Sequence, residues 1–557
     1  MKKDRLIYLP LGGAGEIGMN CYVYGYGPEG KERLILVDCG VTFPDMETSP
    51  GVDLILPDIT WLADRADRLE AIFITHAHED HIGALAHLYS RLRAPVYTRR
   101  FTAVHAKRKM EENGHSPDKV TVVGPLPEQV TAGPFAVQFM PVSHSIPESS
   151  GLIIDSPAGR IVHTGDFKLD ETPGLGEPFD RAAWTAIGDG GVKALVCDST
   201  NILSPHPGRS EISIAPAVTD LVSAARGMVI ATTFASNVSR LKTLAEAGIA
   251  AGRKVCFLGR AMKRMISAGL ESGVIADFPR TITSEEAQGL PRGEVMLIVT
   301  GSQGERRAAS AQLARGKYLG LEAKEGDLFL FSSKTIPGNE RGVIRIMNAY
   351  SEKGVDVVDD VEGLYHVSGH ANRPDLQDVH GLLRPEMLIP MHGEHRHMRE
   401  HMRLAKAGGI ASAIVPNGTM VDLTGDALRT VDHIETGRLY LDGTALVGAL
   451  DGVVRDRIRL ALNGQVIVTM IIDEGGAALG APWADLVGLA ERGRSRKPLG
   501  DEIEETLAAA VDRFDRKTLR DDAAIEEGLR RAVRQVTMDE IGKKPEVTVI
   551  VSRLLDD

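Results

Sequence analysis

The chain has 557 residues, which is too many for one hydrophobic core and predicts roughly two to four domains. Hydrophobic residues make up 43% and charged residues 25%, and the net charge of −12 argues against a protein that coats nucleic acid. This charge does not exclude an enzyme that draws nucleic acid into a local cationic or metal-lined channel, because an active site works through its local field.

Location is predicted from what the sequence lacks. No apolar run approaches the ~20 residues of a membrane span, and the first residues show no long apolar signal-peptide region. The cysteines are scattered, without CxxC spacing, at Cys21, Cys39, Cys197 and Cys256. We therefore expect reduced thiols and a cytoplasmic protein with no membrane partner.

Short apolar runs separated by turns fill residues 1–208 and predict strands. Several runs end directly in a polar or glycine-rich cluster, as in RLILVDCG, AIFITHAH and RIVHTGD. This pattern is typical of strands whose carboxyl ends deliver site residues. We expect residues 1–208 to form the first part of a domain that carries the site.

The pattern changes along the rest of the chain. Residues 209–360 alternate helix-like and strand-like segments and predict an inserted open α/β sheet. Histidines return in YHVSGHANRPD and LIPMHGEHRH, so we expect residues 361–450 to complete the first domain. Residues 451–557 place charged amphipathic helices between two strand-like segments, which predicts a small separate α+β domain.

The stretch THAHEDHIGAL crowds metal-capable side chains into one turn after an apolar strand. His76 and His78 can point the same way, while Asp80 and His81 swing round on the opening turn of a helix. Two divergent ligand sets suit two metal ions, and imidazole with carboxylate but no cysteine favours zinc or manganese over a closed structural zinc site. The alternative is a polar loop with incidental histidines. Glu79 points away from the histidine pair and is not counted as a ligand.

Further candidates close later strands. His144 and Asp166 are expected ligands, with Asp166 bridging two cations, although each alone could be a capping or turn residue. Asp38 either caps a turn or orients a ligand histidine. Asp198 occupies the same position on another strand, with a turn cap as the alternative. His163 is interpreted as structural.

The HAHEDH motif resembles the HxHxDH signature of the metallo-β-lactamase superfamily, and the acid of LILVDCG, His144 and Asp166 match its other motifs in order. The inserted domain, with Asp198, His370 and His392, resembles the beta-CASP nucleases. Nearly the whole chain is similar to the bacterial ribonuclease J family in GGAGEIGMN, HAHEDHIGAL, GDFK, GSQGE, SSKTIPGNE, HVSGHANRPDL and PMHGE. The resemblance implies a metallo-β-lactamase αββα sandwich with an inserted beta-CASP α/β domain and a small C-terminal α+β domain.

The resemblance also implies two divalent ions, with Zn²⁺ expected and Mn²⁺ or Mg²⁺ as alternatives, and a bridging hydroxide that attacks the phosphodiester. One ion would be held by His76, His78 and His144. The second would be held by Asp80, His81 and His392, with Asp166 between the two. Asp80, His370 and Asp198 are the expected catalytic residues: Asp80 would orient the water, and His370 would stabilise the transition state or protonate the leaving oxygen. A structural histidine is the alternative for His370.

A loop with hydroxyl, N–H and imidazole donors is suited to phosphate oxygens, and the family's matching loop contacts RNA. Its residues are His366, Val367, Ser368, Gly369 and His370. Ser236, Asn237, Gly338 and Asn339 are weaker candidates, and an ordinary Pro-Gly turn is the alternative for the last two. A pocket for a 5′-monophosphate would explain 5′-to-3′ degradation.

Two basic or histidine-rich stretches remain open. One is expected to line an RNA path or to form a solvated helix face, and comprises Arg99, Arg100, Lys107, Arg108 and Lys109. The other resembles a second metal cluster but is better interpreted as a helix with exposed or RNA-adjacent side chains, and comprises His395, His397 and His401.

The expected function is a metal-dependent 5′-to-3′ exoribonuclease and endoribonuclease. Its substrate would be single-stranded RNA, preferably 5′-monophosphorylated, in mRNA decay and in the maturation of rRNA and other RNA. The alternatives are a beta-CASP DNA-processing nuclease, a small-molecule hydrolase and a non-catalytic RNA-binding scaffold. The family resemblance implies a homodimer or homotetramer, with RNA-decay or ribosome-associated partners.

Overall fold

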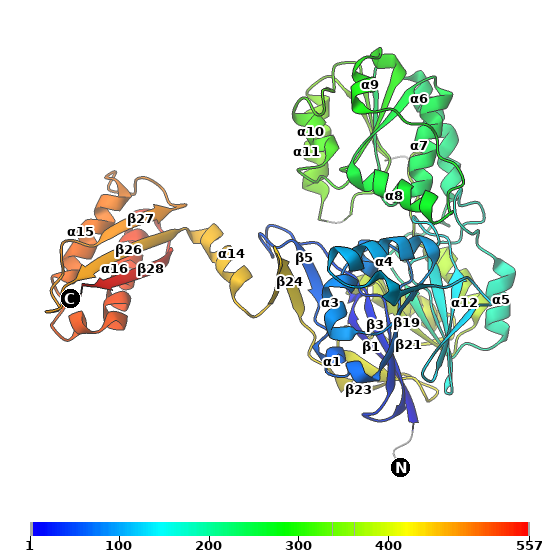
Figure 1. Cartoon of the computed structure of the whole chain (residues 1–557), viewed down its shortest axis with the longest axis horizontal. Coiled ribbons are helices and arrows are strands. Elements are labelled where there is room, and N and C mark those ends of the chain that lie inside the picture. Colours follow the sequence, from blue (N-terminus) through cyan, green and yellow to red (C-terminus); the bar gives the residue numbers. More distant parts are fainter. Residues whose placement is uncertain (1–3, 337, 361–362, 555–557) are drawn as a thin grey trace. The chain divides into compact units, whose positions relative to one another are not determined.

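The computed structural model describes residues 4–336, 338–360 and 363–554 (Figure 1). Its contacts divide the chain into two compact units, Met1–Thr42 with Leu56–Gly437, and Phe43–Ile55 with Arg438–Asp557. Among the described residues, no helix is long and apolar enough to span a membrane.

Two mixed sheets pack face to face in the first unit. The eight-stranded sheet contains, in spatial order, β23 (Arg429–His433), β22 (Thr419–Asp422), β1 (Asp4–Gly12), β3 (Cys21–Pro28), β4 (Arg33–Val37), β6 (Leu69–Phe73), β7 (Val96–Thr98) and β8 (Val120–Val122). The seven-stranded sheet contains β21 (Ala411–Ser412), β19 (Met387–Met391), β13 (Ala194–Asp198), β12 (Gly159–His163), β11 (Ser150–Ser156), β10 (Phe135–Pro141) and β9 (Gln129–Ala132).

The sandwich follows from the two-residue period of its strands. On β1, Leu6 and Tyr8 face a core that also contains Phe73 of the same sheet and Phe139 of the other sheet. The residues between them are buried too, because helices cover the outer faces. These helices are α3 (Leu85–Leu92) and α4 (Arg100–Glu112) on one side, and α5 (Arg181–Asp189), α12 (Arg373–Leu383) and α13 (His395–Ala407) on the other. This arrangement confirms the predicted αββα sandwich.

The inserted region forms a second core with an entirely parallel sheet. Its order is β15 (Lys254–Leu258), β16 (Val295–Val299), β14 (Val229–Thr232), β17 (Leu328–Phe331) and β18 (Asp356–Val358). Its helices are α6 (Ala215–Ala224), α7 (Val238–Ala250), α8 (Arg260–Glu271), α9 (Ser284–Gln288), α10 (Ala309–Arg315) and α11 (Glu340–Ser351). Separate apolar clusters cover the two faces of this sheet, as expected for an α/β domain.

The second unit contains the predicted C-terminal α+β fold. A sheet of β27 (Trp483–Val487), β26 (Gln465–Ile472) and β28 (Glu546–Arg553) packs on α15 (Leu499–Val511) and α16 (Asp522–Ile541) around its own core. The unit also holds α14 (Val453–Asn463), β24 (Arg438–Asp442) and β25 (Ala445–Gly448).

The early segment Phe43–Ile55 belongs to this second unit, whereas the predicted C-terminal domain did not include it. The backbone N–H of Asp53 donates to Leu441 at 2.8 Å, and its carboxylate accepts from Gly443 at 2.8 Å. β5 (Leu54–Pro57) therefore forms a sheet with β24 and β25. The predicted limits at 208, 360 and 450 stay predictions.

Candidate metal centre

The turn that carries the HAHEDH residues is held by close backbone packing. β6 ends at Phe73, and the short helix α2 (Glu79–Ile82) begins directly after His78. Gly40 lies so close that a Cβ atom there would be 1.6 Å from the carbonyl oxygen of Asp80. Asn20 donates its backbone N–H to the same oxygen at 2.9 Å. These contacts fix the direction in which Asp80 leaves the turn.

Three imidazoles converge at the first group of candidate ligands. His78 Nδ1 lies 3.1 Å from His76 Nε2 and 3.2 Å from His144 Nε2. Burial lowers the pKa of all three, to about 4 for His78, so the rings stay neutral. Neutral nitrogens that face one another in a buried site are suited to a shared cation.

A second group lies on the other side of Asp166. The Oδ2 atom of Asp166 is 3.2 Å from His81 Nε2, and Asp80 Oδ2 is 3.2 Å from His392 Nε2. Asp166 Oδ2 also lies 3.9 Å from His76 Nε2 in the first group. The candidate ligand atoms of each group lie within 4.8 Å of one another, with Asp166 in both. A shared carboxylate between two such groups has the composition of a binuclear site.

Asp38 contacts a candidate ligand from behind. Its Oδ2 atom lies 2.7 Å from His81 Nδ1, and its Oδ1 atom accepts the backbone N–H of Thr75 at 2.8 Å. Burial opposes a charge on His81, but the carboxylates around it, Asp166 first, raise its pKa to about 10. The contact turns the Nε2 atom of His81 toward Asp166, as an orienting residue would.

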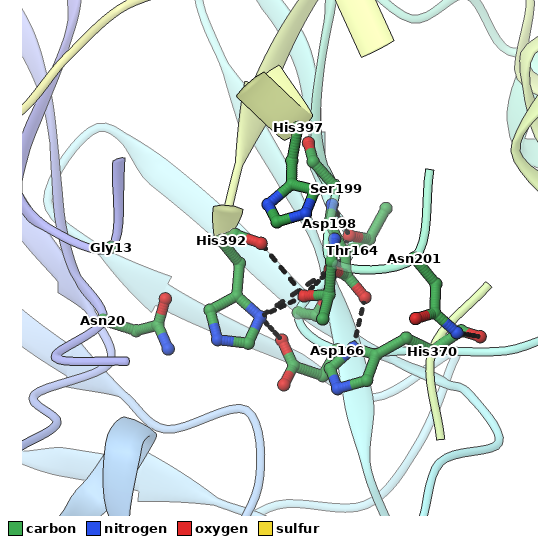
Figure 2. Close-up of polar contacts among 12 residues, drawn as sticks. Gly13, Asn20, Thr164, Asp166, Asp198, Ser199, Asn201, His370, His392 and His397 are labelled. Carbon is green, nitrogen blue, oxygen red and sulfur yellow. Dashed lines mark hydrogen bonds and ion pairs between the residues drawn. The ribbon is translucent and has the colours of Figure 1, made fainter. Parts of the chain in front are cut away.

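His370 and Asp198 form a second acid–imidazole pair beside the ligands (Figure 2). Their Nδ1 and Oδ2 atoms are 2.8 Å apart. Burial opposes a charge on His370, but Asp198 outweighs it and raises the pKa of the imidazole. The other oxygen of Asp198 accepts the N–H of Thr200 at 2.9 Å, so Asp198 also caps its own turn.

The loop from His366 to His370 closes over the first group. His144 donates through Nδ1 to the carbonyl oxygen of Gly369 at 2.6 Å, and a Cβ atom on Gly369 would lie 2.9 Å from that ring. Ser368 accepts a hydrogen bond from Asn201 at 2.8 Å. Val367 packs its side chain into the core of the inserted domain, so only its backbone is available to a substrate.

A cavity of about 410 Å³ adjoins this loop. Its polar lining includes donors and two carboxylates: Ser368, Asn201, Asn372, Lys334, Thr335, His366, Asp359 and Asp360. A cavity of this size accommodates a small ligand. Lys334 with the hydroxyl and amide groups is suited to a phosphate and its sugar, while Asp360 is engaged by the backbone N–H groups of Tyr365 and His366.

The weaker candidates differ in where they lie. Ser236 Oγ is 3.0 Å from His78 Nε2, at the first group. Asn237 instead caps α7: it accepts the N–H of Arg240 at 2.9 Å and is 3% exposed. Gly338 donates to Glu340 and Asn339 donates to Gln303, which ties both to the loops of the inserted domain.

The basic stretch after β7 is largely neutralised. Arg99 is 2% exposed and contacts Glu148 and Glu177, so the expectation that it lines an RNA path is wrong. Its neighbours also pair with carboxylates: Arg100 with Glu148, Arg108 with Glu271, and Lys109 with Glu79. The ion pair with Lys109 also occupies Glu79, the acid of the turn that was not counted as a ligand.

The expectation of exposed side chains is wrong for two of the later histidines, because His397 is 6% and His401 0% exposed. His397 Nδ1 accepts the N–H of Glu394 at 3.2 Å, and His401 lies between Ser199 and His380. Neither belongs to a candidate metal group among the described residues, while His395 begins α13.

Sequence reasoning missed Asn20, Asn201 and Arg240. The two asparagines stand in or beside the motifs GGAGEIGMN and LVCDST, which was a usable signal. Arg240 lies on an ordinary amphipathic helix, and only its three-dimensional contacts distinguish it.

Four family models match consecutive parts of the chain. They are the metallo-beta-lactamase superfamily (residues 14–197), the ribonuclease J beta-CASP domain (226–350), the Zn-dependent metallo-hydrolase RNA specificity domain (354–416) and the ribonuclease J C-terminal domain (452–554). The first match implies divalent metal binding, which agrees with the histidine and aspartate groups.

Relatives match over almost the full length. Ribonuclease J of Sinorhizobium meliloti is 42% identical over 99% of this chain and 98% of its own. Ribonuclease J of Helicobacter pylori is 32% identical over 97% and 78%. A crystal structure of a protein of unknown function from Enterococcus faecalis V583 has a TM-score of 0.52 at 18% identity, over 75% of this chain and 100% of its own, which supports the fold alone.

Proposed function

Since the chain belongs to the ribonuclease J family of metallo-β-lactamase and beta-CASP nucleases, and RNA is its substrate, we propose that it degrades single-stranded RNA from the 5′ end and also cuts it internally. We infer roles in mRNA decay and in the maturation of rRNA and other RNA. The observation that carries the proposal is the pair of buried ligand groups that share Asp166, next to a donor-lined cavity.

We assign His76, His78 and His144 to one divalent ion, and Asp80, His81 and His392 to a second, with Asp166 between them. Zn²⁺ fits this imidazole and carboxylate donor set best. Such ions, when bound, supply the charge that lowers the pKa of water and neutralises the phosphate in the transition state. Asp80 has an oxygen suited to orient that water, and Asp38 keeps His81 turned toward the site.

His370 is assigned the proton transfer to the leaving oxygen. Its raised pKa favours the protonated imidazole, and Asp198 holds its Nδ1 atom so that Nε2 remains for the substrate. The ring lies 5.0 Å from that of His144, so the acid is next to the candidate ligands.

The cavity beside the loop is proposed to hold the 5′-monophosphate. Ser368, Lys334 and the backbone of the loop would bind phosphate oxygens, and His366 would donate from its ring. An end group anchored there would place the next phosphodiester near the ligand groups, which accounts for 5′-to-3′ direction. Strands that pass through without an anchored end would be cut internally.

One substrate panel tests the function. The purified chain, with its metal content measured, is given 5′-monophosphorylated RNA, 5′-triphosphorylated RNA and DNA of the same sequence. We expect mononucleotides from the first, slower internal cuts in the second and little cleavage of DNA. Failure to cleave any RNA with metal bound would refute the proposal, and equal cleavage of DNA would favour a DNA-processing nuclease.

A further inference from the structure

Four charged side chains that the proposed mechanism does not use are buried together beneath the substrate loop. Lys168 is 3% exposed, Asp170 1%, Glu211 4% and Arg240 0%. Burial of charge is costly unless each group is paired and hydrogen-bonded. A group of two cations and two carboxylates at this position therefore requires a structural or functional reason.

The four groups form one continuous network. Lys168 Nζ lies 2.8 Å from Asp170 Oδ2 and 3.8 Å from Glu211 Oε2. Arg240 donates hydrogen bonds to both oxygens of Glu211, with Nε 2.6 Å from Oε1 and Nη2 3.1 Å from Oε2. The backbone N–H of Glu211 donates to Asp170 at 2.8 Å. Every charge has an opposite partner. The bidentate ion pair of Arg240 and Glu211 also fixes the relative orientation of the two side chains.

The network connects two parts of the site. Lys168 follows the shared candidate ligand Asp166 by two residues, in the GDFK motif. Arg240 lies on α7 of the inserted domain. Its Nη1 atom donates to the carbonyl oxygen of Ser332 at 3.0 Å and contacts His366 Nδ1 at 3.2 Å. The network thus runs from the segment after Asp166 to the loop that lines the cavity.

The contact with His366 fixes the position of a proton. Arginine can only donate, so in a hydrogen bond with Arg240 the Nδ1 atom of His366 accepts, and a neutral ring then carries its hydrogen on Nε2. The same Nη1 atom also lies 3.0 Å from the carbonyl oxygen and 3.1 Å from the hydroxyl of Ser332. Burial, followed by the nearby charge of Arg240, lowers the pKa of His366 well below its usual value and keeps the ring neutral. His366 lines the cavity together with Lys334, Asp359 and Asp360, so an Nε2–H group on its ring is available as a donor to a ligand there.

We propose that Arg240 is a positioning residue for RNA, because it sets the tautomer of His366 so that an Nε2–H group donates to the substrate phosphate. Arg240 also connects the loop of His366 to the segment after Asp166, through the network of Glu211, Asp170 and Lys168. The inference rests on the proposed function, because the phosphate is that of the RNA. On this proposal Lys168, the lysine of GDFK, positions the loop and does not contact the substrate directly.

Kinetics test the effect on substrate. Arg240→Lys keeps a cation beside Glu211 but cannot donate to Glu211 and His366 together. We expect the KM for 5′-monophosphorylated RNA to rise about 10- to 100-fold, with kcat and bound metal nearly unchanged. The matched control is Arg253→Lys, a buried arginine of the same domain that donates to the carbonyl oxygens of Gly227 and Val295. A wild-type KM in Arg240→Lys would overturn the proposal.

A second measurement depends neither on turnover nor on the folding of Arg240→Lys. Protein labelled with ¹⁵N-histidine is studied by NMR, and His366 is assigned by the signal lost in His366→Gln. We expect the Nε2–H tautomer in the wild-type chain, and an Nδ1–H or doubly protonated ring would overturn the inference. Wild-type protein that cleaves no RNA would instead refute the proposed function, and the tautomer would still decide the role of Arg240.

Discussion

At the scale of single residues, two neighbouring imidazoles have opposite electrostatic environments. His144 donates to a neutral carbonyl oxygen, and burial lowers its pKa. His370 instead contacts the carboxylate of Asp198, and its pKa is raised. One ring is therefore prepared as a neutral ligand and the other as an acid, although their centroids are 5.0 Å apart.

Replacement of Asp198 by asparagine tests the acid. The carboxylate raises the pKa of His370, so the protonated ring persists to higher pH in the wild-type chain. Asparagine keeps an acceptor for Thr200 but removes the charge, so the protonated fraction is lost at a lower pH. We expect the alkaline limb of kcat against pH to move to lower pH. An unmoved limb would show that another group supplies the proton.

His78 lies at the centre of the first ligand group, because its Nδ1 atom faces nitrogens of both His76 and His144. His78→Ala removes a ligand, so we expect less bound metal per chain and abolished RNA cleavage. Circular dichroism and the melting temperature of the metal-free protein should change little, because the first ligand group packs as neutral rings. His87→Ala, on the adjacent helix α3, is the matched control and should keep both metal and activity.

At the scale of elements, the packing of Gly40 against α2 limits what the turn tolerates. Gly40→Ala would place a Cβ atom 1.6 Å from the carbonyl oxygen of Asp80, so the turn must move. We expect about 1–3 kcal/mol of destabilisation and a loss of metal affinity, measured by denaturant unfolding and metal titration.

Gly381→Ala serves as the control for that change. Gly381 lies in α12, and a Cβ atom there would meet open space. The substitution should stabilise the helix by about 0.5–1 kcal/mol and leave metal binding intact. If both variants bound metal equally well, the packing against α2 would have no part in shaping the site.

Local patterns predicted the elements well, and long-range contacts account for what they missed. Strand periodicity and the HAHEDH spacing are local, so the sandwich strands and the turn before α2 could be expected from the sequence. Arg99 was misjudged because its partner Glu148 is distant in the chain. The assignment of Phe43–Ile55 to the second unit reflects contacts with distant residues, among them a hydrogen bond between residues 390 positions apart.

At the scale of the whole molecule, the two units have separate cores, and all candidate ligands belong to the first. We expect calorimetry of the full chain to resolve two transitions. Added Zn²⁺ should raise the melting temperature of the first unit's transition only. At a Zn²⁺ concentration of 100 Kd, the expected stabilisation of that unit is about 2.7 kcal/mol. A shift of both transitions would mean that the units unfold together.

The order of the candidate ligands along the chain has a consequence for protein synthesis. Six of the seven lie between His76 and Asp166, and the last, His392, follows the whole inserted sheet. A ribosome must therefore complete that sheet, and the loop with His370, before the second ligand group can close. A chain that has not yet reached His392 is therefore an incomplete nuclease while it is attached to its own messenger RNA.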